Sequence, residues 1–135
     1  MPAWAVRNLG ETPLAVDADA NDPDWHPLQY FFGLTAFGAN VFVARREGQT
    51  LVEEHDERAS GQEELYLLLE GEAEFELDGT NLRVARGAVV AVTDPAVRRR
   101  AVASLPGTTL LAIGSAPGCF STTWHASHFA DLARA

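Results

Sequence analysis

One short stretch of the chain combines the residue types that bind metals or small polar molecules. His55 is followed by Glu57, and Glu64 and Tyr66 come soon afterwards. On an extended strand alternate side chains share a face, so His55 and Glu57 point the same way, and an inward Glu64 takes Tyr66 with it. Burying such polar groups costs several kcal/mol unless they pair with one another or hold a ligand. The stretch therefore predicts a polar pocket inside an otherwise apolar core.

The chemistry of this pocket has more than one interpretation. Two carboxylates and an imidazole form a donor set that a divalent metal accepts, which makes His55, Glu57 and Glu64 candidate metal ligands. Tyr66 would add an aromatic wall and a hydroxyl group. A core tyrosine whose hydroxyl meets a backbone partner would explain Tyr66 equally well.

Other reactive groups in the sequence have simpler explanations. The sequence has no Gly-rich phosphate loop, no Ser-centred nucleophile elbow and no Cys-x-x-Cys pair, which argues against nucleotide hydrolysis, serine hydrolase chemistry and zinc ribbons. His125 and His128 are expected to be a surface pair. Cys119 has no neighbouring base or cation in the sequence, so we expect a structural cysteine.

The elements that position the pocket are predicted to be short strands. Apolar or alternating runs lie about ten residues apart between turn residues, which is typical of a sandwich or barrel. Asp78-Gly79 is a strong hairpin signal, because both residues tolerate a positive φ. Only the segment 127–135 has a helical pattern, with Ser127 as its cap. The expected strands cover residues 41–44, 50–55, 64–69, 73–77, 82–85, 88–92, 97–102 and 108–113.

Composition limits the partners and the compartment. The chain has 135 residues, a formal net charge of −9 and no lysine, so we expect no binding to nucleic acid. No apolar run approaches the ~20 residues of a membrane span. A single cysteine and the lack of a signal peptide predict a cytoplasmic protein that does not bind a membrane. The segment 17–27 is acidic, contains two prolines and is expected to be an exposed loop.

The order of the motif residues resembles the cupin family. Gly48, His55, Glu64 and Gly71 follow one another as in its first motif, and the segment 87–98 is similar to the second. The resemblance covers about residues 39–114. It implies an all-β jelly-roll barrel, the cupin-type double-stranded β-helix, as one domain over residues 1–135. N-terminal strands and the acidic loop would occupy residues 1–38, and a short C-terminal helix would lie in a tail over residues 121–135.

The resemblance also indicates where this chain departs from metal-binding cupins, which use three histidines and one glutamate. The second histidine position holds Glu57, and the histidine of the second motif corresponds to Arg98, or to Arg100 if the register slips by two. A guanidinium cannot ligate a metal, because it stays protonated. An arginine–carboxylate pair between Arg98 and Glu57 or Glu64 would then replace the metal at the centre of the barrel.

Three functions remain open. The first is a cupin that binds a small polar or anionic molecule through Arg98, with His55 and Tyr66 orienting the molecule, and with no cofactor. The second is a metal-dependent cupin enzyme, of the dioxygenase or isomerase type, that uses His55, Glu57 and Glu64. The third is a sensor or interaction domain with a vestigial pocket. The fold hosts many functions and does not choose between them.

The N-terminal part of the sequence predicts a homodimer. The segment 28–34 is rich in aromatic residues, and Trp4, Val6 and Leu9 form an alternating run without an obvious partner in the barrel. Pairing such an edge across a two-fold axis would remove its unpaired backbone groups. The alternative is that the segment 28–34 folds back over the pocket mouth of its own subunit.

Overall fold

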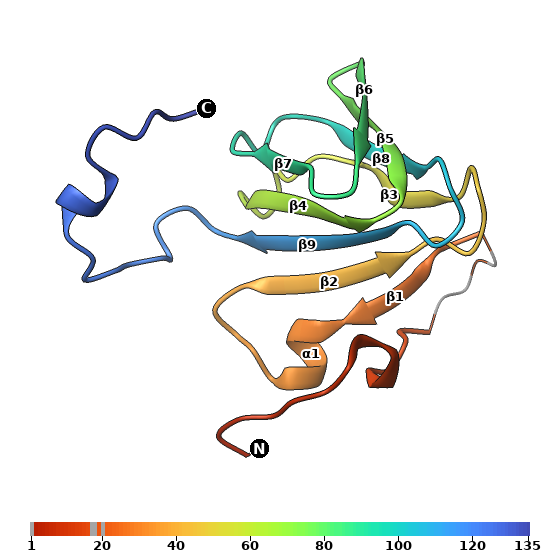
Figure 1. The fold of residues 1–135 in the computed structure, drawn as a ribbon, viewed down its shortest axis with the longest axis horizontal. Helices are drawn as coiled ribbons and strands as arrows, with labels where there is room; N and C mark the ends of the chain where they lie inside the picture. The colour runs from red at the N-terminus through yellow and green to blue at the C-terminus, as the bar shows by residue number, and fades with distance from the viewer. Residues whose placement is uncertain (1, 17–18, 20) are drawn as a thin grey trace.

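The computed structural model describes residues 2–16, 19 and 21–135. Within these residues two antiparallel sheets are formed, and helical structure is confined to short segments (Figure 1). The first sheet has the order β1-β2-β9-β4-β7, and the second has the order β3-β8-β5-β6. The strands are β1 (Asp24–Pro27), β2 (Gly38–Val43), β3 (Thr50–His55), β4 (Glu63–Glu70), β5 (Glu72–Leu77), β6 (Thr80–Ala85), β7 (Val89–Val92), β8 (Arg99–Ala103) and β9 (Thr109–Ser115).

The core lies between the two sheets and follows the period-two alternation of the strands. In β4, Tyr66 and Leu68 point inward and are buried, as are Phe75 in β5 and Leu110 in β9. Tyr66 and Phe75 pack with their ring centroids 5.5 Å apart. Burial of these large side chains contributes the hydrophobic stabilisation that holds the sheets together. The predicted all-β architecture is therefore confirmed.

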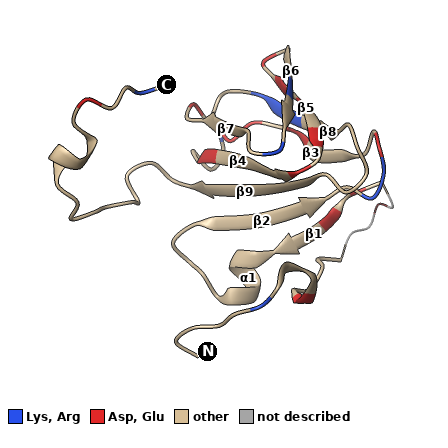
Figure 2. Ribbon diagram, in the orientation of Figure 1, with Lys and Arg blue, Asp and Glu red and all other residues tan. Residues whose placement is uncertain are grey.

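Charged residues are distributed unequally over the two sheets. Figure 2 shows that β2 and β9 carry none, whereas charged residues gather on β3, β5 and β8. The outer face of the four-stranded sheet carries Glu74 opposite Arg83, and Glu76 opposite Arg100. The polar face of this sheet is thus its solvent face.

Most of the predicted strands and the hairpin are present. The strand expected over residues 50–55 has these bounds, and the others differ by a few residues at their ends. Asp78 and Gly79 both have a positive φ, 48° and 82°, as a type I′ turn between β5 and β6 requires.

The N-terminal third differs from the sequence-based prediction. Part of the expected loop 17–27 lies outside the described residues, but Asp24–Pro27 form β1, the edge strand beside β2. A proline is tolerated there because an edge strand leaves one side of its backbone unpaired. The segment Leu28–Phe32 is a short helix, α1, that ends at Gly33 with a φ of 69°. It is therefore not the edge strand that we expected, and Trp4 and Val6 lie outside any strand.

Helical structure in the C-terminal tail is shorter than expected. A 3-10 turn, η2 (Ala126–Phe129), replaces a helix over residues 127–135, and another, η1, covers Leu9–Glu11. In Figure 1 the tail extends away from the barrel. A helix of this length is marginal without a surface to pack on, and the tail residues are exposed. Among the described residues, no helix has the length and apolar character needed to cross a membrane.

Candidate functional site

A cavity of about 370 Å³ opens between the inner faces of the two sheets. Its lining combines an aromatic wall with a group of polar side chains. Within the described part of the chain it is lined by Asp22, Pro23, Trp25, Asn40, Phe42, Thr50, Leu51, Val52, Glu53, Glu54, His55, Glu64, Tyr66 and Ala112. This volume suits a small organic molecule.

Trp25 and Phe42 form the aromatic wall. They lie on paired strands, at positions that are directly opposite each other in the β1–β2 register. Their ring centroids are 6.2 Å apart and their planes are tilted by 30°. The indole Nε1–H of Trp25 donates a hydrogen bond of 2.7 Å to Asn40 Oδ1, which fixes the orientation of the ring. The wall is therefore held in place without a ligand.

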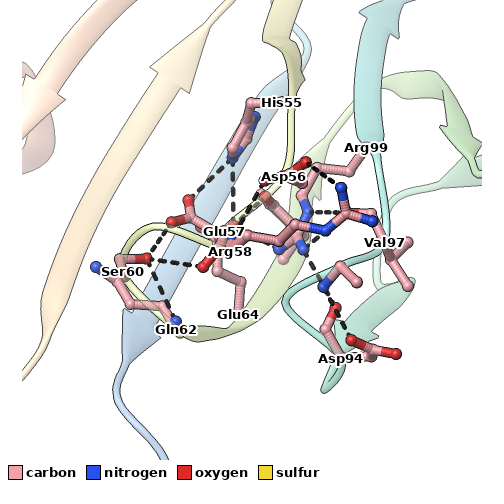
Figure 3. A network of polar contacts seen from close by, with 12 residues as sticks. His55, Asp56, Glu57, Arg58, Ser60, Gln62, Glu64, Asp94, Val97 and Arg99 are labelled. Carbon is pink, nitrogen blue, oxygen red and sulfur yellow. Dashed lines mark hydrogen bonds and ion pairs between the residues drawn. The ribbon is translucent and has the colours of Figure 1, made fainter.

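Five residues, His55, Glu57, Glu64, Tyr66 and Arg99, form a connected polar cluster at one end of the cavity. Figure 3 shows four of them, His55, Glu57, Glu64 and Arg99. The centre of the cluster is the ion pair between Arg99 and Glu64, in which Nη1 donates to Oε1 at 2.7 Å. The Arg99 side chain is fully buried. Its Nε–H and Nη2–H groups donate to the backbone carbonyls of Val97 and Asp94. A buried charge is tolerated when it is paired and hydrogen-bonded in this way.

Tyr66 adds a second donor to the same carboxylate. Its hydroxyl donates to Glu64 Oε1 at 2.8 Å. Burial raises the pKa of the Tyr66 phenol well above its usual range, and the negative charge of Glu64 raises this pKa further. Tyr66 is therefore a hydrogen-bond donor and not a base.

His55 and Glu57 complete the cluster from β3 and from the loop that follows it. The Nδ1 atom of His55 lies 2.8 Å from the backbone carbonyl of Glu53, which only accepts, so Nδ1 carries a proton. Nε2 then faces Glu57 Oε1 at 3.1 Å and Glu64 Oε1 at 3.5 Å. The hydroxyl of Ser60 donates to the other oxygen of Glu57. A register irregularity of β3 against β8 precedes His55.

The buried arginine of the cluster is Arg99, and the prediction for Arg98 is wrong. Arg98 is exposed and pairs with Glu54 at 3.6 Å and Asp56 at 3.7 Å, while Arg100 is exposed on the outer face. The reason is the alternation of β8, in which Arg99, Ala101 and Ala103 are buried and the residues between them are not. In the sequence the larger apolar side chain of Val102 favours the opposite phase, because Val102 shares a face with Arg98 and Arg100.

The other predicted residues lie together, although not all of them line the cavity. His55, Glu64 and Tyr66 line it, whereas Glu57 contacts His55 from the loop after β3. Sequence reasoning missed Trp25, Asn40 and Phe42. The alternation of Asn40 and Phe42 along β2 was a usable signal, because residues two apart on a strand share a face.

Part of the cluster has the chemistry and spacing of a metal site. Ligand atoms of His55, Glu57 and Glu64 lie within 4.8 Å of one another, so this group could hold a metal ion. The proton on Nδ1 of His55 directs Nε2 toward the carboxylates, as backbone partners do for ligating histidines. However, Oε1 of Glu64, the oxygen that faces His55 Nε2, already accepts hydrogen bonds from Arg99 and Tyr66.

The raised pKa of Tyr66 predicts a loss of stability in alkali. An unfolded tyrosine ionises near pH 10.0, whereas the buried phenol keeps its proton there. The stability that the protonated Tyr66 contributes to the folded chain is thus fully present below pH 10.0. Above it the unfolded chain binds fewer protons, and the free energy of unfolding falls by up to about 1.4 kcal/mol per pH unit.

Tyr66→Phe should make this fall less steep, as measured by urea denaturation at a series of pH values between about 10 and 11.5. Tyr30→Phe is the matched control, because Tyr30 is 85% exposed. Equal slopes for Tyr66→Phe and the parent chain would contradict the assignment.

Comparisons with solved structures identify the fold. The chain resembles a cupin protein from Bacteroides fragilis, with 18% identity, a TM-score of 0.63, and coverage of 88% of this chain and 93% of the other. KdgF from Halomonas sp. gives 18% identity and a TM-score of 0.64 over 83% of this chain and 93% of that one. A putative sugar phosphate isomerase from Acidithiobacillus ferrooxidans gives 20% identity and a TM-score of 0.59. The match covers 68% of this chain and 58% of that one.

These similarities, together with the two facing antiparallel sheets, show that the chain has the cupin fold. No family model and no curated protein matches the sequence. With sequence identities of 18–20%, this structural similarity establishes the fold alone, so the function has to be argued from the site.

Proposed function

We propose that this chain is a single-domain, small-molecule-binding cupin whose ligand occupies the cavity beside the polar cluster. One observation carries the proposal: a cavity of about 370 Å³ has a fixed aromatic wall and ends at hydrogen-bonding side chains. Apolar walls with a few fixed polar groups are the usual composition of ligand sites. The wall would cover the apolar part of the ligand, and the polar side chains of the lining would orient its polar part.

Arg99 takes the structural role that a metal has in other cupins. Its guanidinium supplies the positive charge beside Glu64 and fixes that carboxylate with a hydrogen bond of 2.7 Å. The guanidinium offsets one of the two carboxylate charges that Glu57 and Glu64 bring to the cluster. The pair therefore stabilises the cluster without a cofactor.

The cupins of similar structure support a small polar ligand in general terms. One is described as a putative sugar phosphate isomerase from Acidithiobacillus ferrooxidans and another as a sugar phosphate isomerase from Silicibacter pomeroyi. An anionic ligand held by Arg98, as the sequence suggested, has no support here, because Arg98 does not line the cavity.

A ligand screen followed by NMR tests the binding function. We expect small polar compounds that bind to shift the indole N–H resonance of Trp25 and the amide resonances of Phe42, Thr50 and Ala112, all of which line the cavity. Trp25→Phe assigns the indole signal among the three tryptophans. Shifts confined to the outer sheet faces would reject the cavity as the site and favour the interaction-domain alternative.

The second candidate is a metal-dependent cupin enzyme. It is favoured by the spacing of His55, Glu57 and Glu64 and by the orientation of the His55 ring. A divalent ion held by His55, Glu57 and Glu64 would supply Lewis-acid chemistry at their end of the cavity. Metal content separates this candidate from the first.

We also propose that the chain forms a homodimer, now through the outer face of the five-stranded sheet. Leu65 and Leu69 of β4 and Val89 of β7 are 39%, 37% and 57% exposed. Leu67 pairs with Val89 and Leu111, so apolar side chains continue across three strands. A solvent face of a sheet is normally polar, and an apolar face of this kind indicates an interface.

Light scattering at micromolar concentration measures the dimer directly. We expect a mass twice the 14.6 kDa of one chain. Leu65→Glu should reduce this mass to that of one chain, because it places a charge in the interface. Leu82→Glu is the matched control on β6, where Leu82 is 45% exposed. A parent chain with the mass of a monomer would reject the dimer.

A further inference from the structure

The side chains around the cavity are acidic. Asp22, Glu53, Glu54 and Glu64 line it, and His55 is the one described lining residue that can carry a positive charge. Two of the carboxylates have partners, since Glu54 pairs with Arg98 and Glu64 pairs with Arg99. Asp22 and Glu53 form no side-chain ion pair within the described residues. The guanidinium of Arg45 donates to the backbone carbonyl of Asp22, but its charge is paired with Asp24, so the carboxylates of Asp22 and Glu53 are available to a ligand.

These two carboxylates belong to the entrance of the cavity and not to its inner end. Glu53 is exposed and Asp22 is half-buried, whereas Tyr66, at the polar cluster, is buried. A ligand that enters therefore passes ionised oxygen atoms before it reaches the polar cluster. An anion would be repelled at this point. The repulsion between like charges is screened less where the walls have a low dielectric constant.

The aromatic wall favours the same kind of ligand. The faces of indole and phenyl rings carry partial negative charge, and they attract a cation within about 6 Å of the ring centroid. Trp25 and Phe42 are half-buried and tilted by 30°, and the hydrogen bond to Asn40 holds the indole in place. Two aromatic faces beside unpaired carboxylates form the surroundings in which an ammonium group is stabilised.

We propose that the cavity binds an organic cation, a protonated amine with a compact apolar body, between the Trp25–Phe42 wall and the carboxylates of Asp22 and Glu53. The inference rests on the proposed binding function and names the ligand class of that site. The apolar body of the amine lies against the wall, and its N–H groups donate to the carboxylates. Arg99 does not oppose this cation, because its guanidinium is buried and bound to Glu64.

Three probes with one carbon skeleton test the charge preference. Cyclohexylamine is cationic, cyclohexanol is neutral and cyclohexanecarboxylate is anionic, while their size and shape are nearly the same. Each is titrated into the full chain at neutral pH and low salt, and the Trp25 indole resonance is followed. We expect cyclohexylamine to bind about tenfold or more tightly than the carboxylate, which is the effect of one charge-assisted hydrogen bond. Added salt should weaken the binding of the amine alone.

Variants that each remove one negative charge test whether the preference for the cation comes from the carboxylates at the entrance. Asp22→Asn and Glu53→Gln keep the shape of the side chain, and each should weaken cyclohexylamine binding several-fold while cyclohexanol binding stays the same. Glu74→Gln is the matched control, because Glu74 is exposed on the outer face of the other sheet. It removes the same charge from the molecule and should leave the affinity for all three probes unchanged.

The possible outcomes separate the ligand class from the binding function. Equal or tighter binding of cyclohexanol or cyclohexanecarboxylate would overturn the cation preference, and the cavity would still be a binding site. Equal effects of Glu74→Gln and Glu53→Gln would also overturn it, because the net charge alone would then explain the preference. If none of the probes shifts a resonance of the cavity, the binding function fails together with the inference.

Discussion

Replacing Arg99 by methionine should lower the free energy of unfolding by about 3 kcal/mol or more. Methionine fills much of the same volume, but it leaves the Glu64 carboxylate without the guanidinium that pairs with it at 2.7 Å. Arg99 is fully buried, so solvent cannot replace the lost contact. Urea denaturation of the variant and the parent chain at neutral pH measures the difference.

Two further variants make this result specific. Arg99→Met combined with Glu64→Gln should lose less stability than the sum of the single variants, because the double variant no longer buries an unpaired charge. Arg98→Met is the matched control. Its side chain is about half exposed, and its ion pairs lie at 3.6 and 3.7 Å, so we expect a change within about 0.5 kcal/mol. Equal losses for Arg98→Met and Arg99→Met would reject the account of the polar cluster.

Gly71→Ala should destabilise the chain by about 3 kcal/mol. Gly71 joins β4 to β5 with a φ of 81°, a conformation that costs other residues about 1 kcal/mol or more. An added Cβ would also lie 2.8 Å from the Cα atom of Thr108, which is fully buried. The Thr108 hydroxyl contacts the backbone carbonyls of Glu72 and Leu105, so the residue cannot move freely.

Gly87→Ala separates the two causes of this loss. Gly87 has a φ of 91°, but an added Cβ there would have no atom within 4 Å. It should therefore cost about 1 kcal/mol, the backbone effect alone. Thermal and urea unfolding of both variants measure the difference. Equal losses for the two glycines would show that the contact with Thr108 does not matter.

The strand pattern could be predicted from the sequence because it depends on local alternation and on turn residues. The bounds of β3 and the positive φ angles of Asp78 and Gly79 illustrate this. The segment Leu28–Phe32 could not be assigned in this way, since a short apolar run suits both a strand and a helix. The edge strand β1 is defined by its pairing with β2, a contact between segments that composition does not show.

The site was predictable in its residue types and less so in its register. His55, Glu57, Glu64 and Tyr66 do come together, because the end of β3 and the start of β4 lie on facing sheets and contact each other across the space between them. The arginine differs by one position, because a one-residue shift on a strand reverses every side chain. Three consecutive arginines give no local signal for the inward one. That signal comes from Ala101 and Ala103, which share the buried face with Arg99.

The central claim is that the Arg99–Glu64 pair, and not a metal ion, holds the end of the cavity together. Elemental analysis of protein expressed without an affinity tag, in medium that contains iron, manganese, nickel and zinc, tests it most directly. The account predicts a metal content far below one ion per chain and a melting temperature that does not change when EDTA is added. Metal near one ion per chain, together with a lower melting temperature in EDTA, would contradict it and favour the enzyme that uses His55, Glu57 and Glu64 as ligands.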